Sequence, residues 1–139
     1  MSVFVDTSAL IAFQDEDDPG HGQCRDAWAG GLEAGEGFVT TDYVILESVS
    51  VVQRRWGFEA VRTLVDEFLP LVETAWVTPE DHSSGLGVLL TAGRRKLSLT
   101  DCVSFVVMRR LGVREYLGLD PHFDEQGFAR YAPDGHRME

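Results

Sequence analysis

Three aspartates of the sequence stand where carboxylates can meet at one edge of a sheet. Asp6 directly follows the apolar residues 3–5, Asp120 follows the predicted strand at 113–119, and Asp101 opens a long apolar segment. In open parallel sheets, ligands bind outside the carboxyl ends of the strands. Each aspartate also has a purely structural interpretation, because an aspartate at the start of a helix caps it or offsets its dipole.

Glu47 is harder to explain as a structural residue. On a helix it shares a stripe with Val44, three residues before it, and Val51, four residues after it. A carboxylate on an apolar stripe is costly to desolvate unless a cation or an arginine compensates it. The alternative is that the helix turns Glu47 towards solvent at the sheet edge.

Four carboxylates on separate elements favour a hard cation. Ligation by oxygen alone selects Mg²⁺ or Mn²⁺ over zinc. A metal ion of this kind lowers the pKa of a bound water and polarises a phosphoryl oxygen, which is the chemistry of phosphodiester hydrolysis. The histidines lack zinc-ligand spacing and are interpreted as surface or loop residues: His21, His82, His122 and His136.

A run of three basic residues stands shortly before Asp101 and is a candidate for phosphate contacts: Arg94, Arg95 and Lys96. The other basic pairs end predicted helices, where they match the helix dipole: Arg54 with Arg55, and Arg109 with Arg110.

The net charge of −11, from 12 basic and 23 acidic residues, argues against a general nucleic-acid binder. A bound cation and a small basic patch can do locally what a basic surface does elsewhere. The acidity also suits a basic protein partner. Cys24 and Cys102 are too few for a disulfide framework and are expected to be reduced thiols. With no predicted signal peptide or membrane span, a soluble cytoplasmic protein is expected.

Short apolar runs alternate with helical patterns along the chain. Strands are predicted at 3–5, 38–39, 71–77, 113–119 and 128–131, and helices at 7–13, 21–32, 43–55, 58–69, 81–94 and 98–111. A turn is predicted directly after Asp120. Such alternation predicts one α/β domain over residues 1–132, with a mostly parallel sheet of four or five strands, followed by a polar tail at 133–139.

Four segments of the chain together resemble the PIN domain family and, in size, its VapC-type toxin ribonucleases. They are residues 3–10, 40–47, 97–105 and 118–123, the last followed by Gly127 and Phe128. The acidic turn at 15–21 is also similar to the family's pattern. The resemblance covers almost the whole chain and implies a three-layer α/β/α sandwich whose acidic residues bind one or two divalent cations and cut RNA.

By position, the resemblance makes Asp6, Glu47 and Asp101 the core carboxylates and Asp120 the fourth. It implies that neighbouring hydroxyls steady these acids: Thr7 or Ser8, and Thr100. Leu119 departs from the family pattern, in which a hydroxyl residue commonly precedes the fourth acid. Asp124 competes with Asp120 for that role.

The expected function is therefore a Mg²⁺- or Mn²⁺-dependent endoribonuclease, the toxin of a toxin–antitoxin pair. The resemblance further implies products with a 5′-phosphate and a 3′-hydroxyl, a small antitoxin partner and a homodimer. The alternatives are a catalytically inert RNA- or protein-binding module and a housekeeping RNA-processing nuclease. A Mg²⁺-dependent phosphotransfer domain is disfavoured, because the second aspartate of the haloacid-type pattern and the late lysine of the receiver pattern are missing.

Overall fold

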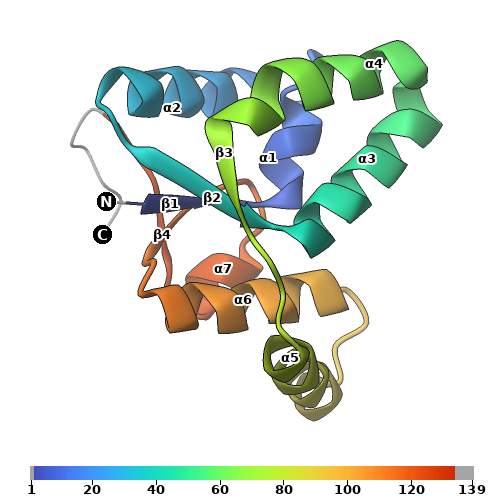
Figure 1. Ribbon diagram of the computed structural model, residues 1–139, viewed down its shortest axis with the longest axis vertical. Coiled ribbons are helices and arrows are strands. Elements are labelled where there is room, and N and C mark those ends of the chain that lie inside the picture. Colours follow the sequence, from blue (N-terminus) through green and yellow to red (C-terminus); the bar gives the residue numbers. More distant parts are fainter. Residues whose placement is uncertain (1, 134–139) are drawn as a thin grey trace.

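The computed structural model describes residues 2–133, which fold around a parallel sheet (Figure 1). Its five strands are β1 (Ser2–Val5), β2 (Gly37–Thr41), β3 (Val72–Ala75), β4 (Glu115–Leu117) and β5 (Ala129–Arg130). They are ordered β3-β2-β1-β4-β5, and every neighbouring pair is parallel. The predicted α/β class with a mostly parallel sheet of four or five strands is confirmed.

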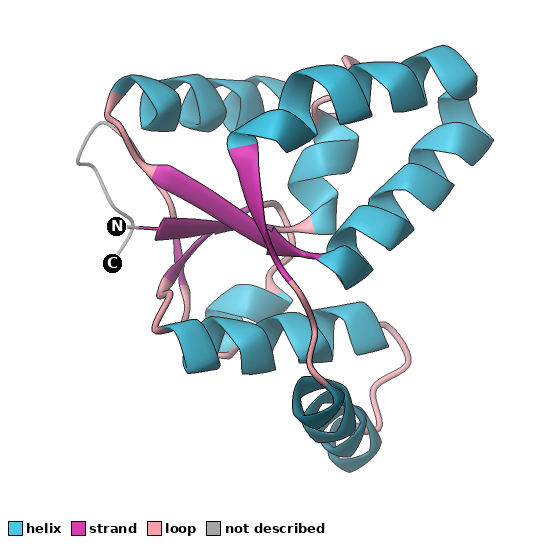
Figure 2. Cartoon of the chain, viewed as in Figure 1, coloured by secondary structure: helices cyan, strands magenta, loops and turns pink. Residues whose placement is uncertain are grey.

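Helices cover both faces of this sheet, as Figure 2 shows. On one face lie α1 (Thr7–Ala12), α2 (His21–Glu33), α3 (Asp42–Trp56) and α4 (Phe58–Thr63). On the other lie α6 (Leu99–Leu111) and the short α7 (His122–Glu125), and α5 (Pro79–Ala92) packs against α6 (Figure 1). The architecture is the three-layer α/β/α sandwich that was predicted.

Helices bury both faces of the sheet, which explains why the strand sequences are apolar. Val3, Phe4 and Val5 of the central strand are fully buried. Aromatic rings fill both layers: Trp28 stacks on Phe38 with ring centroids 4.5 Å apart under α2. On the opposite face, four aromatic rings contact one another: those of Phe105, Phe123, Phe128 and Tyr116. This core holds the strand ends, and the loops that follow them, in fixed positions.

Two local predictions differ from the structure. The helix expected at 58–69 is α4 followed by a π-helical turn (Leu64–Phe68) and a 3₁₀ turn (Leu69–Leu71), because Pro70 lacks the N–H that a continuing helix needs. The turn predicted after Asp120 contains the four-residue helix α7, which is too short to produce a periodic pattern.

Other expectations concern the cysteines, the membrane and the tail. Cys24 and Cys102 are buried free thiols, as predicted. Among residues 2–133, no helix combines the length and apolar character that crossing a membrane requires. Most of the predicted polar tail, including His136, lies outside the described residues.

Candidate metal centre

The candidate site lies at the carboxyl ends of β1 and β4, where the strand order has a switch point. The chain moves outward from β1 to β2 on one side and continues through β4 and β5 on the other, so the order reverses between β1 and β4. Ligand sites of parallel sheets form at this reversal. Asp6 follows β1, Asp120 follows β4, and α6, which carries Asp101, begins at the same edge (Figure 1).

Asp6 is held rigidly at the end of β1. Its backbone N–H donates to the Leu117 carbonyl at 3.0 Å, and its carboxylate caps α1. Oδ2 accepts from the Ser8 hydroxyl at 2.8 Å, and the Leu119 N–H donates to that hydroxyl at 2.8 Å. The residue is 2% exposed, yet Oδ1 is buried with no hydrogen-bond partner among residues 2–133. An anionic oxygen in that position is costly unless a cation compensates it.

Gly118 lets the loop after β4 approach Asp6 closely. A Cβ at this position would lie 2.9 Å from the Ser8 Oγ and 3.1 Å from the Asp6 Cβ. These separations are shorter than ordinary carbon contacts. A side chain at residue 118 would therefore push apart the two loops that carry Asp6 and Asp120.

Asp101 is positioned by a capping box at the start of α6. The Ser98 N–H donates to Asp101 Oδ2 at 3.1 Å, and the Asp101 N–H donates to the Ser98 hydroxyl at 3.0 Å. This reciprocal pair fixes the first turn of the helix and the carboxylate together. Sequence analysis missed the role of Ser98, although the Ser-x-x-Asp spacing before an apolar run is the signal for it.

Asp120 and His122 form a tight turn beside Asp101. Asp120 Oδ1 accepts the His122 backbone N–H at 2.9 Å and lies 2.8 Å from the His122 Nδ1. Donor atoms of Asp101, Asp120 and His122 all lie within 4.8 Å of one another. The interpretation of His122 as a surface or loop residue is therefore wrong: α7 returns its ring, 14% exposed, to the acidic cluster.

Glu47 lies half-buried at the rim of the cluster. The Thr41 hydroxyl caps α3 by accepting the Val44 N–H at 3.1 Å, which sets the rotation of the helix. Val44 is buried and Val51 is half-buried, so Glu47 stands on neither a fully buried nor a fully solvated stripe. Its charge contributes to raising the pKa of Asp101, which shows that α3 brings it into electrostatic range.

Burial and nearby negative charges raise the pKa values of Asp6 and Asp101. Burial, and then the nearby charges of Asp101 and Asp120, raise the pKa of Asp6 to about 7. Burial also raises the pKa of Asp101, with Asp120 and Glu47 adding to the effect. Mutual repulsion among buried acids is the electrostatic signature of a site that a divalent cation would relieve.

Asp6 gives the metal-free protein a specific pH dependence. The folded protein keeps a proton that the unfolded chain, with a pKa near 3.8, releases. The stabilisation that the protonated Asp6 carboxyl gives the fold is therefore complete below pH about 4 and is lost as the pH rises through about 7. Relative to Asp6→Asn, which cannot ionise, we expect the unfolding free energy of the wild type to fall by a few kcal/mol over this range.

Urea unfolding in EDTA, at pH values from about 5 to about 8, measures this difference. Asp26→Asn, at an exposed aspartate of α2, is the matched control and should follow the wild type. Curves of Asp6→Asn and wild type that stay parallel across the range would contradict the assignment.

The remaining predicted residues fall into two groups. Asp124 lies outside the cluster, because its Oδ1 accepts from the Tyr116 hydroxyl at 2.9 Å and its Oδ2 lies 3.9 Å from Arg130. Of the predicted hydroxyls, only that of Ser8 bonds a cluster carboxylate among the described residues; Thr7 Oγ1 is buried without a partner, and Thr100 is half-buried beside Asp101.

The basic run lies on the exposed loop between α5 and α6. Arg94 Nη1 contacts both carboxylate oxygens of Glu125, at 3.2 and 3.3 Å, so its charge is partly neutralised. Arg95 and Lys96 are exposed. Phosphate contacts by these three residues stay a prediction.

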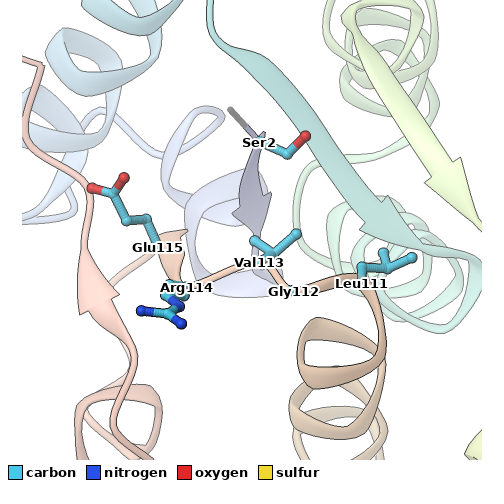
Figure 3. Close-up of a pocket in the computed structure, with 6 residues that line it drawn as sticks. All are labelled: Ser2, Leu111, Gly112, Val113, Arg114 and Glu115. Carbon is cyan, nitrogen blue, oxygen red and sulfur yellow. The ribbon is translucent and has the colours of Figure 1, made fainter.

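A separate depression lies at the opposite edge of the sheet. It measures about 450 Å³ and is bounded by Ser2 and the turn from α6 to β4, residues 111–115 (Figure 3). These residues stand at the amino ends of β1 and β4, whereas Asp6 and Asp120 follow the carboxyl ends. The depression therefore does not belong to the acidic cluster.

Comparison with known proteins agrees with this architecture. The family model described as PIN domain matches residues 3–132. The 23S rRNA-specific endonuclease VapC20 of Mycobacterium tuberculosis, found in two strains, is 28% identical over 133 residues, covering 95% of this chain and 99% of the relative.

Solved structures show the same arrangement of elements. The crystal structure of Mycobacterium tuberculosis VapC20, described as a toxin that cleaves the sarcin–ricin loop, superposes with a TM-score of 0.78 at 28% identity, over 91% of this chain and 95% of that one. VapBC2 from Rickettsia felis, bound to a DNA fragment from its promoter, shares the fold with a TM-score of 0.66 at 13% identity, over 90% and 92% of the two chains. The chain belongs to the PIN domain family.

Proposed function

We propose that this protein is a metal-dependent endoribonuclease, the toxin of a toxin–antitoxin pair. The observation that carries the proposal is the buried, unpartnered Oδ1 of Asp6, in a carboxylate whose pKa is raised by its own burial and by Asp101 and Asp120. Such a set of oxygens suits Mg²⁺ or Mn²⁺. The relationship to VapC20, named as an endonuclease of 23S rRNA, supports RNA as the substrate.

In this proposal, Asp6, Asp101 and Asp120 hold the ion, with Glu47 at the rim. When bound, a divalent cation polarises a phosphoryl oxygen and lowers the pKa of a water molecule. The protein supplies the positions: the Ser8 hydroxyl fixes Asp6, the capping box fixes Asp101, and the turn at His122 fixes Asp120. We expect products with a 5′-phosphate and a 3′-hydroxyl.

The acidity of the chain makes RNA binding dependent on the cation. With a net charge of −11, the protein repels phosphates except where the ion and exposed basic side chains such as Arg95 and Lys96 act. The first substrate to test is 23S rRNA, because a relative that matches almost the whole chain is named for cleaving it.

Removal of the metal is expected to abolish cleavage and to lower the melting temperature. The four carboxylates repel one another, and only a bound ion compensates their negative charges. An ion at about 100 times its Kd should add about 3 kcal/mol to the unfolding free energy.

The measurement combines cleavage of 23S rRNA with thermal unfolding, in EDTA and after adding back Mg²⁺ or Mn²⁺. Asp124→Asn is the matched control and should respond to the ions as the wild type does, since its carboxylate pairs with Tyr116. Undiminished cleavage in excess chelator would rule the proposal out.

We also propose a small antitoxin partner and a homodimer. Large apolar side chains are exposed on and near α3 and α5: Leu46 is 69%, Trp76 69% and Leu90 79% exposed. In this proposal, the antitoxin or the second copy covers these side chains. The acidic surface suits an inhibitor segment that carries arginine.

A further inference from the structure

The acidic cluster contains a nitrogen donor that the four-carboxylate scheme leaves unused. His122 Nδ1 is buried and lies 2.8 Å from Asp120 Oδ1, and a ring nitrogen of His122 lies with donor oxygens of Asp101 and Asp120 in a group no wider than 4.8 Å. Histidine nitrogen and carboxylate oxygen together bind first-row transition ions. The question is whether this nitrogen merely orients Asp120 or faces the ion itself.

The distance between the His122 ring and the Asp120 carboxylate is short, but the contact is not a hydrogen bond. Nδ1 lies 2.8 Å from Asp120 Oδ1, yet its direction gives it no hydrogen-bond partner among residues 2–133. Two donor atoms 2.8 Å apart can both lie about 2.1 Å from one ion and subtend roughly 85° there, close to the right angle of octahedral coordination. The pair therefore has the spacing of two adjacent ligands of one ion.

The backbone holds this pair in place without the ion. Asp120 Oδ1 also accepts the His122 N–H at 2.9 Å, so the turn at Pro121 fixes the carboxylate relative to the residue that carries the ring. The imidazole is 14% exposed and has little space to swing into solvent. A preformed pair of this kind loses little conformational freedom on binding an ion.

A second and independent observation points to the same space. Asp6 is 2% exposed, and its Oδ1 has no hydrogen-bond partner among the described residues. Asp6 lies within electrostatic range of both Asp101 and Asp120. Asp6 is not one of the three residues whose donor atoms lie within 4.8 Å of one another, but its carboxylate is tied to the loop that carries Asp120 through the Ser8 hydroxyl, which accepts the Leu119 N–H.

We propose that His122 Nδ1 is a direct ligand of the ion, so that the centre is a mixed nitrogen–oxygen site that binds Mn²⁺ in preference to Mg²⁺. This inference rests on the proposed function and specifies the chemistry of its site. Mg²⁺ is bound almost entirely by oxygen, whereas ions further along the transition series accept imidazole more readily. With oxygen ligands alone, the two ions would be less well distinguished.

Electron spin-echo spectroscopy of bound Mn²⁺ tests the proposal directly, with no reference to cleavage. Full-length wild-type protein loaded with one equivalent of Mn²⁺ should show ¹⁴N modulation from a coordinated imidazole. His122→Ala should lose it, and His122→Asn, which offers an amide in nearly the same place, should lose the imidazole frequencies. His82→Gln is the matched control, because that half-buried histidine lies outside the group of Asp101, Asp120 and His122 and its Nδ1 already pairs with the Tyr43 hydroxyl at 2.7 Å; its spectrum should equal that of the wild type.

Calorimetric titration of the same proteins with each ion gives the second measure. In His122→Ala the Kd for Mn²⁺ should rise at least tenfold, while the Kd for Mg²⁺ should change less than about threefold. Thermal unfolding in EDTA checks that the variant is folded, and His122→Asn replaces it if it is not.

The outcomes separate this inference from the proposed function. Mn²⁺ that binds to the wild type without ¹⁴N modulation would leave the carboxylate centre standing and overturn the role of His122. Equal losses of Mn²⁺ and Mg²⁺ affinity in both His122 variants would do the same, because that result describes a residue that only orients Asp120. If neither Mn²⁺ nor Mg²⁺ bound to the wild type, both proposals would be overturned.

Discussion

Asp101→Asn is expected to lower RNA cleavage about 10³-fold or more, while the protein keeps its fold. The substitution removes one negative charge and one strong metal ligand, and a metal ion contributes several kcal/mol to phosphodiester hydrolysis. The amide oxygen of asparagine can still accept the Ser98 N–H, so the capping box that starts α6 should persist. The burial that raises the pKa of Asp101 no longer acts on a charge, so the metal-free variant should be at least as stable as the wild type.

The measurement is the rate of 23S rRNA cleavage at saturating Mg²⁺ or Mn²⁺, together with thermal unfolding. Asp124→Asn is the matched control, because that aspartate stands four residues after Asp120 but bonds Tyr116 and lies outside the cluster. Its rate should stay within a few-fold of the wild type. A cleavage rate for Asp101→Asn equal to that of Asp124→Asn would show that the acidic cluster is not the catalytic centre.

The position of each carboxylate along the chain was predictable from the sequence because local rules govern it. Asp6 follows a run of three apolar residues and caps a helix, and the alternation of strands and helices predicts a parallel sheet, whose strands all end at the same edge. These rules place Asp6 and Asp120 at one edge without any knowledge of side-chain packing. The same reasoning predicted that Asp101 opens a helix, and the capping box shows how it does so.

The position of His122 in the cluster could not be predicted from these local rules. Its place in the cluster depends on a single turn of helix that follows Pro121, and a four-residue helix is too short to reveal itself by periodicity. A hydrogen bond from the His122 backbone N–H to the Asp120 carboxylate holds the turn that carries the ring. Histidine spacing along the sequence carries no information on the approach of His122 to Asp101, because Asp101 comes from a separate helix.

The contact of Asp81 with Arg110 was not predicted, for a different reason. The sequence predicted a helix beginning at Asp81, and in the structure this residue closes a capping box with Thr78 in the first turn of α5. Its second role, a contact with Arg110 at the end of α6, joins residues 29 positions apart. From the sequence, Arg110 was interpreted only as a match to the helix dipole. Pairing between two helices depends on their rotation, which the packing of α5 on α6 decides.

This ion pair ties α5 to the helix that carries Asp101. Asp81 is 3% exposed and accepts Arg110 Nε at 3.0 Å, Arg110 Nη2 at 2.8 Å and the Thr78 N–H at 3.0 Å. The hydrogen bonds from Arg110 hold the pKa of the Asp81 carboxyl below its usual value. The stabilisation is therefore present at neutral pH and is lost as the pH falls through that lowered pKa.

Asp81→Ala is expected to lower the unfolding free energy by about 3 kcal/mol, because it removes a capping box and one partner of a buried ion pair. Arg110 keeps access to solvent, with 42% of its side chain exposed, which holds the loss at the low end of the range for buried pairs. Urea unfolding at neutral pH gives the value, and Glu80→Ala, the exposed acid of the same helical turn, should change it by less than about 0.5 kcal/mol. If the two variants lose the same free energy, then the cap and the contact with Arg110 do not stabilise the fold, and the packing of α5 on α6 must depend on apolar contacts alone.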